Sequence, residues 1–218
     1  MIVLALDTAG VDCAAAVYDS GSESVMGEVT ETIGRGHAEH LMGVVDRALA
    51  QAGLTLSAIE RIVVTVGPGS FTGIRIGVAA ARGFALSLGI PAVGVTTLEI
   101  MAAAARADNP GKAVLAAIDA KREEIYLQPF DADGHPLDEP RAVTVDEARA
   151  IADAFDGIVT GTAVARLHGE TPADRPDVFP IAVVARLGAA KPLDEKPKPL
   201  YLRGPDARPQ AGYAVARV

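Results

Sequence analysis

Two aspartates stand where a short apolar run gives way to a turn, and their chemistry could serve a nucleotide. Asp7 follows the apolar residues 2–6 and precedes Thr8, and Asp119 follows the similar run 114–118. A carboxylate in such a place can hold Mg²⁺ through water beside a bound nucleotide. Asp7, Thr8 and Asp119 are therefore the candidate nucleotide or phosphate residues. Aspartates also favour turns because they hydrogen-bond local backbone, so the residue types leave a purely structural role open.

A glycine-rich segment is the most informative part of the chain. Residues 67–73 read GPGSFTG and lead into a predicted helix that reaches about residue 88. A glycine inside a helix costs roughly 1 kcal/mol relative to alanine, so several of them indicate a need in packing or function. A spacing of four residues puts small side chains on one nearly bare helix face, formed by Gly69, Gly73, Gly77 and Ala81.

This glycine face has three interpretations. It could pack inside the protein, against the sheet or the first helix. It could receive the helix of another protein, because a bare face lets a second backbone approach closely. It could also bind an anion, because Ser70 and the backbone N–H groups of the loop lie at a helix N-terminus. The loop is not a Walker A loop, since no Lys-Ser/Thr pair follows the glycines.

The histidines are weak candidates for a metal site. His37 and His40 are three residues apart at the start of a predicted helix, so both lie on roughly one face. No further Cys or His follows at the spacing of a zinc motif, and His135 and His168 are isolated. The sequence therefore predicts no metal site and favours a packing or interface role for the pair.

The same helix carries an apolar stripe at helical spacing. Leu41, Val44 and Ala48 recur at three and four residues, with charged residues on the other side. His37 and His40 lie toward this stripe, each four residues before one of its members.

Motifs of other enzyme classes are missing from the sequence. No Gly-x-Ser-x-Gly nucleophile elbow occurs, and no complete Gly-x-Gly-x-x-Gly fingerprint opens a helix. The single cysteine, Cys13, has no partner thiol and is interpreted as a small buried hydrophobic residue. No convincing catalytic set is found.

Strands and helices alternate along the chain, which predicts the α/β class. The predicted strands cover residues 2–6, 13–18, 25–32, 61–66, 91–95, 114–120, 124–130 and 158–160. The predicted helices cover residues 41–52, about 70–88, 97–105, 143–155 and 182–190.

Length and composition narrow the class of protein further. Half of the 218 residues are apolar, only 4% are aromatic, and the formal net charge is −8. An acidic chain with few aromatic rings is poorly suited to binding tRNA directly. No signal peptide is recognised, and no apolar stretch of about 18 residues is found; residues 77–94 come closest. We therefore expect a soluble, cytoplasmic protein.

The chain reads as two parts. The DNPG segment at residues 108–111 is the best candidate boundary, which divides the chain into 1–108 and 109–218. The second part begins like the first, with an apolar strand that ends in Asp and then turns. This similarity between the two parts covers few residues, so the residues alone do not decide whether the chain arose by internal duplication. From Lys191 onward the chain is rich in proline and is predicted to be extended.

Taken together, these motifs resemble the TsaB (YeaZ) family. The first 130 residues carry most of the resemblance, and residues 130–195 match only in outline. The matching segments are LALDTA at 4–9, HLM at 40–42, GPGSFTGIRIG at 67–77, GVTTL at 94–98, LAAIDAKR at 115–122, EIY at 124–126 and PLYLR at 199–203.

The resemblance implies an actin-like fold of the sugar kinase and Hsp70 type, with two related lobes of mixed sheets flanked by helices. It also implies a subunit without catalytic activity of its own. Such a subunit pairs with the homologous catalytic subunit TsaD and with the ATPase TsaE, and the complex installs threonylcarbamoyl on the adenosine next to the tRNA anticodon. Contact with tRNA is then indirect, and family members also pair with themselves.

The resemblance implies a partner interface on the N-terminal helices. Its candidate residues are His37, His40, Leu41, Val44, Ala48, Gly69, Ser70, Phe71, Gly73, Arg75, Gly77, Ala80 and Ala81. The catalytic relative holds its metal through His-x-x-x-His, and here the two histidines are one residue closer. No cofactor is expected for the chain alone, whereas a nucleotide with Mg²⁺ at the TsaD interface is left open.

Two other functions remain as alternatives. One is an actin-fold ATPase or small-molecule kinase that acts alone and uses Asp7 and Asp119. The other is a peptidase, for which the sequence offers neither a nucleophile–base pair nor a full set of metal ligands.

Overall fold

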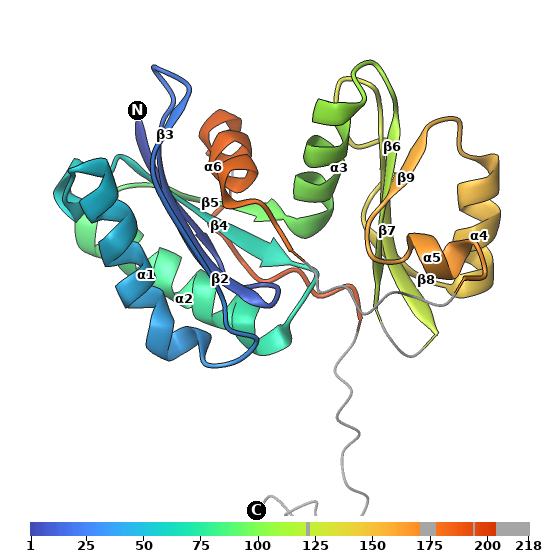
Figure 1. The fold of residues 1–218 in the computed structure, drawn as a ribbon, viewed down its shortest axis with the longest axis horizontal. Coiled ribbons are helices and arrows are strands. Elements are labelled where there is room, and N and C mark those ends of the chain that lie inside the picture. The colour runs from blue at the N-terminus through green and yellow to red at the C-terminus, as the bar shows by residue number, and fades with distance from the viewer. Residues whose placement is uncertain (121–122, 171–177, 194, 204–218) are drawn as a thin grey trace, which may run out of the picture.

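A computed structural model describes residues 1–120, 123–170, 178–193 and 195–203 (Figure 1). Its first sheet has five strands in the order β3-β2-β1-β4-β5. These strands are β1 (Ile2–Asp7), β2 (Asp12–Asp19), β3 (Ser24–Thr32), β4 (Arg61–Gly67) and β5 (Ala92–Thr96). The first three form an antiparallel meander, whereas β4 is parallel to β1 and β5 is parallel to β4.

Helices cover both faces of this sheet, which explains why β1, β2 and β4 are buried along almost their whole length. The helices α1 (His37–Ala52) and α2 (Phe71–Leu88) lie on one face, and α6 (Ile181–Ala190) lies on the other (Figure 1). A short 3₁₀ helix, η1 (Leu56–Ala58), connects α1 to β4.

The second sheet is smaller, with four strands in the order β8-β7-β6-β9. Its strands are β6 (Val114–Asp119), β7 (Glu124–Phe130), β8 (Arg141–Thr144) and β9 (Ile158–Thr160). On its outer side lie α4 (Val145–Ala154) and α5 (Val164–Leu167), and on its inner side lies α3 (Thr97–Asp108) (Figure 1).

The two sheets repeat one topology, which confirms the expected pair of related lobes. Each begins with three antiparallel strands, then passes through a helix, then adds a strand parallel to its first strand. Each lobe is also covered by a helix from the other part of the sequence. The helix α3 follows the strands of the first sheet but packs on β6 of the second, and α6 follows the strands of the second sheet but packs on the first. The predicted division at residues 108–109 falls between α3 and β6. The helix α6 comes after this division in the sequence but packs on the first sheet, which comes before it. The two-domain division itself stays a prediction.

A short segment near the described end of the chain contacts both lobes, and we call residues 200–203 the clasp. The backbone N–H of Leu200 donates to the carbonyl oxygen of Val66 on β4 over 2.8 Å. Arg203 forms an ion pair with Glu124 on β7, and its Nη2 lies 3.4 Å from the carbonyl oxygen of Ala120. The clasp therefore joins the first sheet to the second. Residues 204–218 lie outside the described residues.

By length and composition alone, α2 could cross a membrane, which corrects the expectation that no such stretch exists. Only 28% of this helix is buried. Its buried side packs on β4 and β1, as in a helix of a globular core. The buried residues of α2 are Gly73, Ile74, Gly77, Val78 and Ala81.

Candidate functional site

The turn after β1 is closed rather than open to a ligand. Asp7 and Thr8 have no exposed surface. The Oδ1 atom of Asp7 accepts from the N–H of Ala9, and the Thr8 hydroxyl donates to the carbonyl oxygen of Gly73 over 2.7 Å. Since neither side chain presents an oxygen to solvent, they do not fit a bound phosphate in this arrangement.

The burial of Asp7 has an electrostatic consequence. Its Oδ2 atom lies buried without a hydrogen-bond partner among the described residues, as does the hydroxyl of Thr65. Burial raises the pKa of Asp7 to about 6, and the hydrogen bond from Ala9 partly opposes this shift. Asp7 is therefore a buried, weakly acidic group of the fold.

The glycine face packs against this same turn, so the structure settles one of the open interpretations. A Cβ atom added at Gly73 would lie 1.9 Å from the carbonyl oxygen of Thr8, and one at Gly77 would lie 2.6 Å from the Thr8 hydroxyl. At Gly69 the added atom would lie 2.5 Å from the carbonyl oxygen of Ala9. The interpretation of this face as a surface for another protein is therefore wrong for Gly73 and Gly77, which are buried, whereas exposed Gly69 stays a candidate interface residue. These glycines are small because the β1–β2 turn occupies the space.

Ser70 caps its own helix, which argues against the interpretation of this loop as an anion-binding site. Its side chain accepts from the backbone N–H of Gly73 over 3.2 Å, and its own N–H donates to the carbonyl oxygen of Ala9. Two of the groups that an anion would need at the start of α2 are thus already engaged within the protein.

The apolar stripe of α1 is also internal. Leu41, Val44 and Ala48 are buried, and α1 packs on β2 and β3. Gly27 on β3 allows this approach, because a Cβ atom there would lie 2.2 Å from the carbonyl oxygen of Ala48. These three side chains, and buried Ala81 of α2, form the core of the first lobe and do not face a partner.

The two histidines of α1 have separate environments. The His37 ring is buried, with Nε2 3.1 Å from the carbonyl oxygen of Asp12. His40 is exposed, and its Nδ1 lies 3.2 Å from a carboxylate oxygen of Glu31. Glu31 also pairs with Arg47 at 2.6 Å. The pair therefore does not converge on one point as metal ligands would.

One other group could hold a metal by proximity, which corrects the expectation that His135 is isolated. Asp131, Asp133 and His135 lie on the turn after β7, and their ligand atoms lie within 4.8 Å of one another. Asp131 uses an oxygen to accept from the N–H groups of Asp133 and His135, which lowers its pKa. The turn's own hydrogen bonds account for this arrangement, and exposed acidic groups of this kind are common.

Cys13 behaves as expected. It is buried in β2, and burial raises the pKa of its thiol to about 11. A thiol with so little thiolate at neutral pH is a small hydrophobic residue and a poor nucleophile.

The second aspartate is engaged differently from the first. Asp119 pairs with Nη1 of Arg166 at 2.9 Å, while Nη2 of the same residue pairs with Glu123 at 2.7 Å. The N–H of Asp119 donates to the Thr162 hydroxyl. Asp119 is thus engaged by Thr162 of the loop after β9 and by Arg166 of α5. Lys121 and Arg122 of the matching segment lie outside the described residues.

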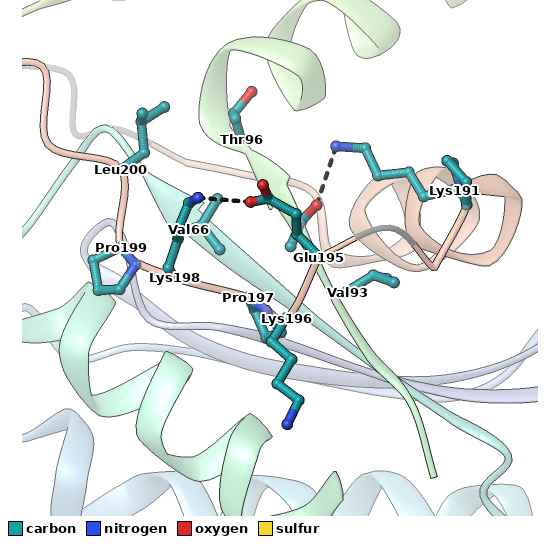
Figure 2. Close-up of a pocket in the computed structure, with 12 residues that line it drawn as sticks. Val66, Val93, Thr96, Lys191, Glu195, Lys196, Pro197, Lys198, Pro199 and Leu200 are labelled. Atoms are coloured by element: carbon teal, nitrogen blue, oxygen red, sulfur yellow. Dashed lines mark hydrogen bonds and ion pairs between the residues drawn. The ribbon is translucent and has the colours of Figure 1, made fainter.

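A hollow lies where β4 and β5 end, under the segment that leads to the clasp (Figure 2). Its volume is about 320 Å³, and its walls are mainly apolar residues such as Val66, Val93 and Pro197. Lys191 is held by the carbonyl oxygen of Gly94 and by the Glu99 carboxylate. The Lys191 ammonium group is therefore neutralised within the protein, and Lys198 pairs with Glu195 at 2.6 Å, so neither lysine offers the hollow an unpaired charge.

The outer side of α2 is apolar and uncovered, and sequence reasoning did not single it out. Leu86 is 86% exposed, and Ala79 and Gly83 lie beside it on the exposed side. A Cβ atom at Gly83 would meet nothing within 4 Å. On the neighbouring helix, Met42 is 45% exposed. We call Met42, Ala79, Gly83 and Leu86 the outer helix face. None of these was among the candidate interface residues; Ala80, which was, is partly buried and packs against the core.

Two further candidates, Phe71 and Arg75, are exposed at the start of α2. They form a cluster with Tyr201 of the clasp, which the sequence did not reveal because the contact spans 126 residues. The Arg75 guanidinium lies 3.8 Å from the centre of the Phe71 ring, and its Nε donates to the Tyr201 hydroxyl over 2.8 Å.

Comparisons with known proteins agree with this architecture. The family model described as "TsaD: tRNA N6-adenosine threonylcarbamoyltransferase" matches residues 17–173. The chain is 38% identical over 133 residues to the Escherichia coli "tRNA threonylcarbamoyladenosine biosynthesis protein TsaB", a match that covers 61% of this chain and 56% of that protein. It is 37% identical over 215 residues to an uncharacterized protein of Mycobacterium bovis, covering 96% and 95%.

Among solved structures, YeaZ from Pseudomonas aeruginosa has a TM-score of 0.76 and 27% identity, covering 92% of this chain and 99% of that one. The α/β, actin-like class with two mixed sheets flanked by helices is thereby confirmed. The chain spans little more than half the length of the curated TsaB relatives that it matches.

Proposed function

Since the chain belongs to the family described as TsaD, tRNA N6-adenosine threonylcarbamoyltransferase, and resembles TsaB (YeaZ) within it, we propose that it is a partner subunit in the synthesis of threonylcarbamoyladenosine in tRNA. It binds the TsaD protein of its own organism and has no catalytic activity of its own. The TsaE ATPase joins the same complex, and contact with tRNA runs through the complex. A nucleotide with Mg²⁺, where one is used, is held jointly with TsaD.

The observation that carries this proposal is the outer helix face. A helix of 18 residues with only 28% of it buried leaves apolar surface in water, and contiguous surface of this kind marks an interaction site. Ala79 and Gly83 are small and exposed, so the helix of a partner can come close to the backbone of α2. The partner therefore contacts the side of α2 opposite to the glycine face.

The engaged states of these side chains support a subunit without its own activity. Asp7 and Thr8 are buried beneath the start of α2, and Asp119 is paired with Arg166. In the competing proposal of an independent ATPase or kinase, these are the groups that would meet a phosphate. They would have to be uncovered before they could do so.

The decisive experiment measures binding to TsaD from the same organism. Leu86→Glu places a charge on the outer helix face and should weaken the complex at least about 30-fold, as for a central contact of an interface. Leu137→Glu is the matched control, because Leu137 is also an exposed leucine, at 59% against 86% for Leu86, but lies on the turn after β7. Its binding should equal that of the unaltered chain.

Two results would overturn the proposal. One is the absence of any complex between the unaltered chain and its TsaD, measured by sizing and calorimetry. The other is tight binding of ATP·Mg²⁺ to the isolated chain that Asp7→Ala abolishes, which would favour the independent enzyme.

A further inference from the structure

The Phe71–Arg75–Tyr201 cluster holds a guanidinium group in a defined orientation on the surface. The Phe71 ring supports one face of it at 3.8 Å, and the Tyr201 ring centre lies 5.8 Å away. The two rings are 5.3 Å apart, and the bond from Nε to the Tyr201 hydroxyl fixes the rotation of the plane. Phe71 and Tyr201 are 55% and 46% exposed, so the cluster faces solvent.

The outer edge of this guanidinium is available. Nε is the one Arg75 atom with a hydrogen-bond partner within the described part of the chain, so both Nη groups keep their donors. Two parallel N–H donors match the two oxygens of a carboxylate, and this paired geometry is stronger than a single contact. Because stacking already orders the side chain, binding loses less conformational entropy.

The positive charge of α2 also favours a carboxylate as the group that Arg75 binds. α2 carries Arg75 and Arg82 and no acidic residue, although the whole chain has a net charge of −8. A positive helix on an acidic protein selects a partner with a complementary negative group. tRNA phosphate would offer similar oxygens, but the acidic chain as a whole repels a polyanion, so a protein carboxylate is favoured.

We infer that Arg75, held by Phe71 and Tyr201, is an anchor that receives an Asp or Glu carboxylate of the protein docking on the outer helix face. This inference rests on the proposed function, because the partner is the same. The apolar rings around Arg75 exclude water once the partner is bound. Exclusion of water distinguishes an anchor from an ordinary exposed ion pair, which contributes little.

The test measures the affinity of Arg75→Gln for TsaD of the same organism by calorimetry at low and high salt. An anchor predicts a loss of at least about 10-fold at low salt, together with a weaker salt dependence than that of the unaltered chain. Tyr201→Phe keeps the ring and removes the hydroxyl, so its loss should be smaller than that of Arg75→Gln.

Arg82→Gln is the matched control. Arg82 has the same charge, lies two turns further along the exposed side of α2, and has no aromatic ring against it among the contacts of the described chain. Its loss should stay below about 3-fold, as for a solvent-exposed charge. Thermal unfolding of each variant verifies that the fold is kept.

The outcomes separate this inference from the proposed function. If Arg75→Gln stays within 3-fold of the unaltered chain while Leu86→Glu disrupts the complex, the anchor is refuted and the function stands. If Arg75→Gln and Arg82→Gln lose affinity equally, a general charge effect replaces the anchor. If Arg75→Gln keeps its TsaD affinity but weakens binding of the complex to tRNA, the acceptor is a phosphate and the inference is overturned. If the unaltered chain does not bind TsaD, both proposals fail.

Discussion

Gly83 lies on the exposed side of α2, and adding a single methyl group there should stabilise the protein. A Cβ atom at this position meets nothing within 4 Å, so it causes no clash. Alanine is favoured over glycine inside a helix by about 1 kcal/mol. We therefore expect Gly83→Ala to raise the free energy of unfolding by about 0.5–1 kcal/mol. For a chain of this size, that is a rise in melting temperature of roughly 1–4 °C.

The same substitution at Gly73, in the same helix, should lower the free energy of unfolding instead of raising it. There the methyl carbon would lie 1.9 Å from the carbonyl oxygen of Thr8, which is backbone and cannot swing away. The gain in helix propensity is the same, but separating the β1–β2 turn from α2 should cost more than about 3 kcal/mol. The difference between the two variants thus measures packing alone.

Urea denaturation followed by circular dichroism measures both free energies. A destabilised Gly83→Ala, or a Gly73→Ala as stable as the unaltered chain, would refute the assignment of the covered and uncovered sides of α2. Gly83→Leu extends the test to binding. It should keep or raise the stability of the chain, because leucine is also a good helix former. It should nevertheless weaken the complex with TsaD by filling the space that the partner helix needs.

Three further predictions concern buried or partly buried polar groups. The pKa of Asp7 in the folded protein is about 6, above its ordinary value of 3.8, so its favourable contribution is complete below pH 4 and is lost as the pH rises through 6. Asp7→Asn should therefore remove a decline on the order of 3 kcal/mol between pH 4 and pH 7, and an unchanged pH profile would contradict this. Arg61 is buried and its Nη1 donates to three carbonyl oxygens at the end of α6, so Arg61→Met should destabilise by roughly 2–4 kcal/mol and speed hydrogen exchange in α6. Stability unaffected by this change would show that α6 is held by apolar contacts alone. Arg166→Met removes the 2.9 Å ion pair with Asp119 and should cost about 1–2 kcal/mol, and losses of Arg166→Met and Asp119→Asn that simply add in a double-mutant denaturation cycle would argue against coupling.

Most of the fold could be predicted because its elements are long and strongly patterned. The strands β1, β4 and β6 are apolar runs that end at turn residues, and α1 repeats its apolar residues every three or four positions. β8 and α5 were missed because each has only four residues, too few for a period to be visible. The helix predicted from residue 143 begins only after Thr144, which is the last residue of β8 and caps the helix.

The candidate site was harder to predict, and the reason lies in the glycines. A stripe of small residues shows that something approaches a helix closely, but it does not show what approaches. Here Thr8 and Ala9, some sixty residues earlier in the chain, occupy the stripe. The contact of Tyr201 with Arg75 was not predicted for a similar reason, because it depends on the path of the chain through both lobes.

The return of α6 to the first sheet has a consequence for synthesis of the chain on the ribosome. The strands of the first lobe are complete at residue 96, yet the helix that covers their inner side begins at residue 181. While the intervening residues are being synthesised, α6 does not yet cover Val63 and its apolar neighbours on that face of the sheet. This apolar surface can then aggregate or bind chaperones. Products that stop short of α6 should therefore be removed by proteolysis, so that only nearly full-length chains accumulate.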